Sequence, residues 1–273
     1  MRSGLARTAL EVAQVRARES IRTDRLFNDP YAGLFVTAAL GDEPETQERS
    51  SEATAWQLVM AFNVAIRTRF FDDYLIESSQ VGCTQVCLLG AGLDTRAFRL
   101  DWPTGSRIFE IDLPDVLNFK EDVLHGESAR AGTTRTVIAS DLRQNWDADL
   151  LKAGFDPAEP TAWLAEGLLV YLSADEAARF LTTIGALSAP GSRIAFEHAG
   201  SGHSSASQEA EAIPEMRALI ALVKGGLGDG TLDWLSDHDW QPQVHSRVDL
   251  ADEYGRAVTG RPNGGLVTAT RQS

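Results

Sequence analysis

Short apolar runs that end in glycine or in an acidic residue recur through the middle of the chain, with segments of helical periodicity between them. Runs of this kind are typical of strands buried in a parallel sheet. The predicted strands cover residues 85–89, 107–112, 136–139, 161–166 and 192–197. The predicted helices between them cover residues 113–125, 144–153 and 174–188. This alternation indicates an α/β fold with a doubly wound, mostly parallel, Rossmann-like sheet.

The first 80 residues are predicted to be helical. Apolar positions at helical spacing predict helices over 9–22 and 56–76. Between them, Asp29 is expected to cap a helix whose first residue is Pro30. We expect residues 1–80 to form a helical cover over the sheet domain.

The end of the chain carries weaker signals. Segments 243–248 and 265–270 predict two further strands, which bring the sheet to seven and form a closing hairpin at one edge. A loop, a helix and a Gly-rich loop are expected before them, at about 200–240. We predict that this insertion is a lid within a sheet domain spanning 81–273.

Composition narrows the function classes. The 273 residues include 39 acidic and 25 basic side chains, for a net charge of −14, which disfavours nucleic acid as a partner. The sequence contains neither a membrane-length apolar run nor the apolar core of a secretory signal, so we expect a cytoplasmic protein. Cys83 and Cys87 are expected to be reduced packing residues, and no metal site is predicted. Composition leaves the oligomeric state open.

Four of the five central strands end in or beside an acidic residue. These residues are Asp112, Asp141, Glu166 and Glu197. Ligands of open α/β sheets bind at the carboxyl ends of the strands. Buried carboxylates there are unfavourable unless they meet donors or a cation, although an Asp after a strand can also be a helix cap. The row therefore predicts a binding site, with capping as the alternative for each single residue.

The turn after the first strand, Gly90-x-Gly92, favours a nucleoside ligand. Glu110 and Asp112 follow Gly90 by 20 and 22 positions, the spacing of a ribose-binding carboxylate in nucleotide-binding units. Thr95 replaces the third glycine of the dinucleotide fingerprint, and no Tyr-x-x-x-Lys pair is present, so NAD is disfavoured. Acids after the second and third strands suit adenosine without phosphates, beside a sulfonium cation. This ligand is S-adenosylmethionine.

Four motifs together carry a family resemblance. They are GAGLDTR at 90–96, FEIDLP at 109–114, DLR at 141–143 and AEGLLVYL at 165–172. In this order they resemble the leucine carboxyl methyltransferase family, in particular its bacterial branch of S-adenosylmethionine-dependent O-methyltransferases found in actinobacteria. Segments 22–31, 66–72 and 263–269 extend the resemblance over nearly the whole chain.

The resemblance implies roles for single residues. Arg67 would pair with the methionyl carboxylate of the cofactor, with Gly90 close to the methionyl part. Asp112 would hold the ribose hydroxyls, Asp141 would flank the adenine, and Glu166 would lie near the ammonium group. The predicted cofactor-binding residues are Arg67, Gly90, Gly92, Asp94, Asp112, Leu113, Asp141, Leu142 and Glu166.

The predicted reaction is methylation of a carboxylate of a small, natural-product type acid. A carboxylic acid, with a pKa near 4, is ionised at neutral pH, so its methylation needs no general base. One alternative is a phenolic or hydroxyl O-methyltransferase in which His198 is the base. Another is a non-catalytic protein that binds the cofactor.

Further residues are candidates for contact with the acceptor. Tyr171 could orient the acceptor carboxylate or pack against the lid, and Arg22 and Arg25 could clamp an anionic substrate or lie on a solvated helix face. Arg96 and Arg99, after the Gly turn, are expected at the surface or as partners of a helix dipole, with contact to the site as the alternative.

Overall fold

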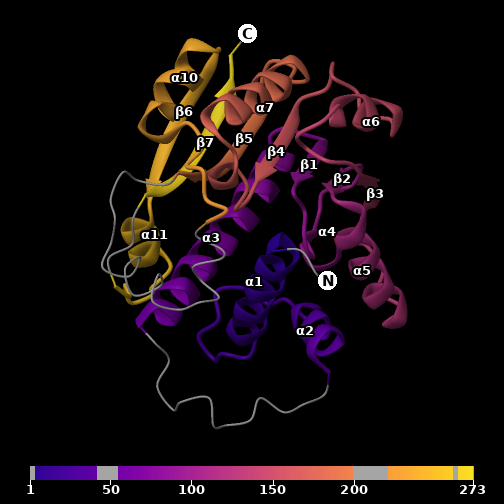
Figure 1. Cartoon of the computed structure of the whole chain (residues 1–273), viewed down its shortest axis with the longest axis vertical. Coiled ribbons are helices and arrows are strands. Elements are labelled where there is room, and N and C mark those ends of the chain that lie inside the picture. The colour runs from indigo at the N-terminus through magenta and orange to yellow at the C-terminus, as the bar shows by residue number, and fades with distance from the viewer. Residues whose placement is uncertain (1–3, 42–54, 199–220, 261–263, 273) are drawn as a thin grey trace.

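The central sheet has the predicted architecture. The computed structural model describes residues 4–41, 55–198, 221–260 and 264–272 (Figure 1). The strands are β1 (Gln85–Leu89), β2 (Arg107–Asp112), β3 (Thr134–Ala139), β4 (Thr161–Ala165), β5 (Arg193–His198), β6 (Trp240–Ser246) and β7 (Gly265–Arg271). They form one sheet in the order β3-β2-β1-β4-β5-β7-β6, and β7 runs antiparallel to both of its neighbours. The prediction of a doubly wound, mostly parallel sheet is confirmed.

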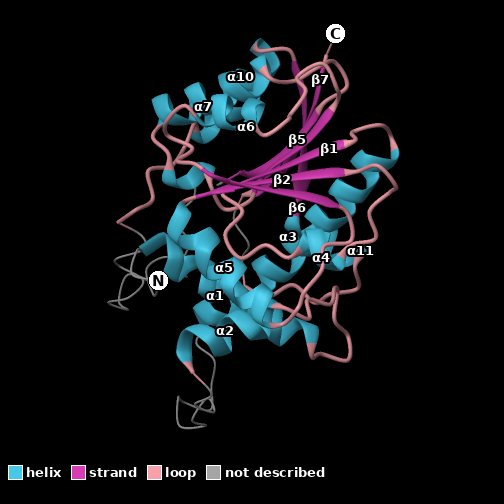
Figure 2. Cartoon of the chain, turned by 90° about the vertical axis from the view of Figure 1, so that its right-hand side faces the viewer, coloured by secondary structure: helices cyan, strands magenta, loops and turns pink. Residues whose placement is uncertain are grey.

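Helices cover both faces of this sheet (Figure 2). They are α1 (Gly4–Ser20), α2 (Ala32–Leu40), α3 (Ala55–Gln80), α4 (Arg96–Arg99), α5 (Pro114–Gly126), α6 (Trp146–Lys152), α7 (Ala174–Ala186), α10 (Thr231–Asp237) and α11 (Arg247–Glu253), with short 3₁₀ helices η1 (Leu169–Tyr171) and η2 (Gly228–Gly230). Helices α6, α7 and α10 lie on one face, and α3, α4 and α11 lie on the other.

Strand alternation divides the core between the two faces. Cys87 and Leu89 of β1 belong to the cluster under α6 and α7, whereas Val86 and Leu88 belong to the cluster on α3. Cys83 and Cys87 are free and buried, and burial raises the pKa of the Cys83 thiol to about 11. The predicted packing role of the cysteines is confirmed. No helix among the described residues is long and apolar enough to cross a membrane.

Helices α1 and α2 lie on the side of the sheet where the parallel strands end (Figures 1 and 2). Asp29 accepts hydrogen bonds from the backbone N–H groups of Tyr31 and Ala32, each at 3.1 Å, as a capping residue does. The regular helix begins at Ala32, two residues later than predicted. Arg16 of α1 pairs with Asp29 at 3.0 Å and donates to the carbonyl of Leu93 at 2.6 Å, which fixes α1 to the turn after β1.

The last two strands form the predicted antiparallel pair at one edge of the sheet, but a helix separates them along the chain. Helix α11 lies between β6 and β7, because the Ser246 side chain accepts from the N–H groups of Val248 and Asp249 and caps a helix there. Strand β7 lies between β5 and β6, so β6 forms the edge of the sheet.

The predicted lid falls partly outside the described residues, because 199–220 are not described. The following Gly-rich segment packs on the chain around η1. The N–H groups of Lys224 and Gly225 donate to the carbonyl of Val170, at 2.8 and 3.0 Å, and Gly226 donates to the carbonyl of Leu172 at 2.9 Å.

Candidate functional site

The turn after β1 lies where the strand order reverses, between β2 and β4, the usual ligand-binding position of such sheets. Gly90 and Gly92 have φ values of +68° and +48°, which glycine adopts readily. A Cβ at Gly90 would lie 3.4 Å from Leu168, and one at Gly92 would lie 3.5 Å from Ala9 of α1. The turn therefore offers bare backbone between the β4–η1 segment and α1.

Asp112, at the end of β2, is tied to this turn. Its Oδ2 accepts from the N–H of Gly92 and its Oδ1 accepts from the N–H of Leu113, both at 2.6 Å. Burial raises the pKa of Asp112, and the two backbone donors oppose that rise. The carbonyl of Asp112 accepts from the N–H of Ser140 at 3.0 Å, which places the turn after β3 beside it.

Asp141 follows in that turn and is bound locally. Its carboxylate accepts from the backbone N–H of Arg143 at 3.0 Å and from the guanidinium at 2.6 and 2.9 Å. The hydrogen bond from Arg143 lowers the pKa of Asp141. Asp141 does not cap α6, whose N-cap residue is Asn145, and Leu142 beside it packs on the core cluster under α6.

Helix α3 carries Arg67 to the ends of β4 and β5. Its Nε lies 2.9 Å from Oε1 of Glu166, and its Nη1 donates to Oε2 of Glu197 at 2.9 Å. Glu197 also pairs with Arg247 of α11, at 3.1 Å. Burial raises the pKa of Glu197, but the charges of Arg67 and Arg247 outweigh burial and lower it overall. Gly167, with φ +62°, passes over the pair, since a Cβ there would lie 3.6 Å from Glu197.

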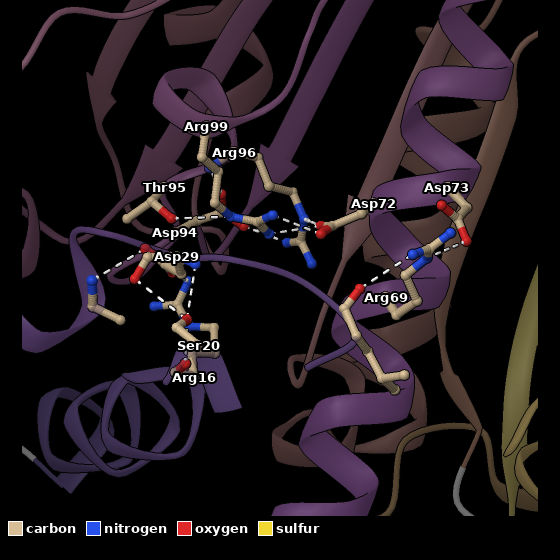
Figure 3. Close-up of polar contacts among 12 residues, drawn as sticks. Arg16, Ser20, Asp29, Arg69, Asp72, Asp73, Asp94, Thr95, Arg96 and Arg99 are labelled. Carbon is tan, nitrogen blue, oxygen red and sulfur yellow. Dashed lines mark hydrogen bonds and ion pairs between the residues drawn. The ribbon is translucent and has the colours of Figure 1, made fainter. Parts of the chain in front are cut away.

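Arg96 and Arg99 are buried, and the expectation that they lie at the surface is wrong (Figure 3). Nε of Arg96 pairs with Asp72 at 2.7 Å, while its Nη1 pairs with Glu166 at 2.8 Å and with Asp94. Arg99 makes two bonds to Asp72, at 2.6 and 2.7 Å. Burial raises the pKa of Asp94, but nearby positive charges, led by Arg96, bring it down to about 2. These arginines lie inside because carboxylates on other elements surround them.

Tyr171, in η1, lies near Arg67 and Glu197. It is half-buried, its side chain hydrogen-bonds with Thr8 of α1, and it lies within the electrostatic influence of Arg67 and Glu197. Burial raises the pKa of Tyr171, so the phenol remains protonated at neutral pH. Helix α1 therefore covers both the Gly turn and Tyr171.

The remaining candidates are His198, which adjoins Glu197, and two arginines of the N-terminal segment. His198 ends β5 and lines a cavity of about 20 Å³, room for one water, together with Glu197 and the Gly-rich segment 225–228. Arg22 is half-exposed and pairs with Asp24 at 2.8 Å, and Arg25 is exposed. The structure does not bring either arginine to the strand-end cluster. The described residues contain no group of three or more His, Cys, Asp and Glu side chains arranged to hold a metal ion.

Comparison with known proteins gives one family. Residues 9–185 match the leucine carboxyl methyltransferase family. An inferred S-adenosyl-L-methionine-dependent methyltransferase of Frankia alni is 46% identical over 99% of this chain and 95% of its own length. A similarly described protein of Saccharopolyspora erythraea is 48% identical over 99% of this chain and 89% of its own length.

Solved structures share the fold. A crystal structure of an inferred methyltransferase from Thermobifida fusca superposes with a TM-score of 0.58 at 18% identity, over 96% of this chain and 94% of that one. The magnesium protoporphyrin IX methyltransferase of Synechocystis, with bound S-adenosylhomocysteine, superposes with a TM-score of 0.50 at 11% identity, over 83% and 90%.

Proposed function

Because the chain belongs to the leucine carboxyl methyltransferase family, it is an S-adenosylmethionine-dependent methyltransferase, and we propose that its acceptor is a carboxylate of a small, natural-product type acid. The products would be a methyl ester and S-adenosylhomocysteine. The observation that supports the cofactor-binding part of the proposal is the position of Arg67, held between Glu166 and Glu197 at the ends of β4 and β5.

The residues at the strand ends fit this cofactor. The carboxylate of Asp112 is fixed by two backbone donors and would hold the ribose hydroxyls. Leu142, with Asp141, would flank the adenine. Arg67 uses Nε and Nη1 on the two glutamates, so its Nη2 would meet the methionyl carboxylate. The bare backbone at Gly90 gives the room that a Cβ would take.

When bound, S-adenosylmethionine supplies a methyl group that its sulfonium has already activated. A carboxylate acceptor is ionised at neutral pH, so the chain need not remove a proton. Its task is to align the acceptor and to exclude water, and such orientation is worth roughly 7–11 kcal/mol in model reactions. Tyr171 would donate its O–H to the acceptor carboxylate. We propose that residues 1–80 cover the site, as the contact of Thr8 with Tyr171 supports.

A hydroxyl acceptor is the second candidate, because His198 lies beside Glu197 at the end of β5. A phenol, with a pKa near 10, would benefit from such a base. Replacement of such a base by alanine would then lower the rate with a hydroxyl acceptor. Carboxylate methylation without a base predicts no such loss in a His198→Ala variant.

Titration calorimetry tests the binding part of the proposal. We expect S-adenosylhomocysteine to bind with micromolar affinity and NADH not to bind. A screen of small carboxylic acids with methyl-labelled cofactor then tests turnover. Binding without transfer to any acid in the screen would contradict the proposed reaction and favour a non-catalytic role.

A further inference from the structure

One face of α3 follows β4 and β5 along their length. Near the start of β5, Arg193 donates to Oγ of Ser78 at 3.2 Å. In the middle of β4, the Tyr74 hydroxyl donates to the carbonyl of Trp163 at 3.2 Å. At the strand ends, Arg67 reaches Glu166 and Glu197. Residues 67, 74 and 78 thus form a helical stripe that faces these strands, since they lie seven and eleven positions apart.

Asn63 is the next residue of this stripe. It precedes Arg67 by four positions, so it lies on the same face about 6 Å further along the axis. Helix α3 runs from beside α11 up to β1, so this direction leads away from the strands (Figure 1). Asn63 therefore lies beyond the carboxyl ends of β4 and β5, where a ligand of the sheet would be bound.

The side-chain carbonyl of Asn63 is a hydrogen-bond acceptor without a donor in the described part of the chain. Its Oδ1 is buried and has no hydrogen-bond partner among the residues that the structure describes. A buried, unpaired polar atom destabilises the folded state, so each one in a native protein needs an explanation, of which a functional role is one. As a carbonyl oxygen, Oδ1 needs an O–H or N–H donor.

We propose that Oδ1 of Asn63 accepts a hydrogen bond from a hydroxyl group of the acceptor, and that the acceptor is therefore a hydroxylated carboxylic acid. This inference rests on the proposed carboxylate methylation. Arg67 lies between Asn63 and the strand ends that would hold the cofactor, so the partner of Asn63 belongs to the acceptor. Asn63 is a neutral amide, whereas a carboxylate side chain at this position would repel an anionic acceptor.

Paired substrates test the proposal. Methyl transfer would be measured with hexanoate against 2- and 3-hydroxyhexanoate, and with octanoate against its hydroxy acids. For the wild type we expect kcat/KM to be roughly tenfold to a hundredfold higher for the preferred hydroxy acid than for its unhydroxylated partner, because an unpaired buried polar atom costs about 1–3 kcal/mol. In Asn63→Leu, which has a similar volume, this ratio should fall to about one.

Two controls separate this role from a structural one. Asn63→Leu should unfold at the same temperature as the wild type or higher, because it removes an unpaired buried oxygen, and should keep the wild-type affinity for S-adenosylhomocysteine. Asn118→Leu, at an exposed position of α5, should leave the substrate ratio unchanged.

Each contrary result has one meaning. Loss of S-adenosylhomocysteine affinity in Asn63→Leu would assign the residue to the cofactor and overturn the inference. Equal wild-type rates for each pair of acids, or an unchanged ratio in the variant, would overturn it while leaving carboxylate methylation intact. Failure of the wild type to methylate any of these acids, while other carboxylic acids are methylated, would overturn the inference alone. Failure with every carboxylic acid would contradict the proposed function itself.

Discussion

Replacement of Asp112 by alanine should remove most of the affinity for the cofactor. In the structure each carboxylate oxygen already accepts one backbone N–H, from Gly92 and from Leu113, at 2.6 Å. These bonds fix the carboxylate at the end of β2. Its remaining lone pairs are then available to the two ribose hydroxyls without further ordering of the side chain.

The size of the effect follows from this count. Hydrogen bonds to a charged group contribute about 1.5–3 kcal/mol each. Loss of two such bonds should weaken binding by about 3–6 kcal/mol, which is roughly two to four orders of magnitude in Kd. Asp112→Asn should also be impaired, because its NH₂ group must face one of the two backbone donors.

The assay is titration calorimetry with S-adenosylhomocysteine, with thermal unfolding as a check on the fold. Asp115→Ala is the matched control, because Asp115 is exposed in the first turn of α5 and makes no contact with the Gly turn that the structure records. It should bind like the wild type. A folded Asp112→Ala protein with wild-type affinity would refute the assignment of Asp112 to the ribose.

Four further outcomes are expected. Arg96→Met should lower the free energy of unfolding in urea by about 3–5 kcal/mol, because it leaves buried carboxylates unpaired. Arg143→Met, which breaks an exposed pair, should lower it by about 1 kcal/mol or less. Equal losses in the two variants would contradict the buried network. Gly90→Ala should reduce the affinity for S-adenosylhomocysteine at least about tenfold, because Gly90 has a positive φ and lies against Leu168. The control Gly105→Ala, at a position with positive φ but open space, should affect only stability. Similar affinities in the two variants would contradict the close approach at Gly90. The pKa of Asp94 is about 2 against an ordinary 3.8, so its contribution to the free energy of unfolding is complete above about pH 4 and is lost as pH falls towards 2. The free energy of unfolding in urea should therefore depend less on pH over this range in Asp94→Asn than in the wild type. An identical dependence would contradict the pairing of Asp94. With a carboxylic acid as acceptor, kcat/KM should be flat from about pH 6 to 9, and a fall below pH 7 would indicate a histidine base.

Most of the sheet could be predicted because its strands are short apolar runs bounded by glycine or acidic residues. β1 and β2 begin and end where the pattern places them. The order of the last strands was not predictable in the same way. Strand β6 mixes buried and exposed positions and contains Pro242, as an edge strand can, and no local period specifies which neighbour a strand pairs with.

The strand-end row of the site was also predictable, because its residues follow the strands directly. The burial of Arg96 and Arg99 was not, since an arginine after a turn resembles a surface residue unless its partners are known. The partners of Arg96, Asp72 and Glu166, come from 24 positions earlier and 70 positions later in the chain, and Arg99 shares Asp72. Asn63 carries no sequence signal at all, because its proposed role follows from its position one helical turn before Arg67 on α3.

The most direct test of carboxylate methylation is the chemical nature of the product. The protein would be incubated with S-adenosylmethionine labelled in its methyl group and with small carboxylic acids, and the labelled product would be treated with mild alkali. We predict that the label is released as volatile methanol, because methyl esters hydrolyse under these conditions. A labelled product that survives alkali, as a methyl ether does, would contradict the proposed function.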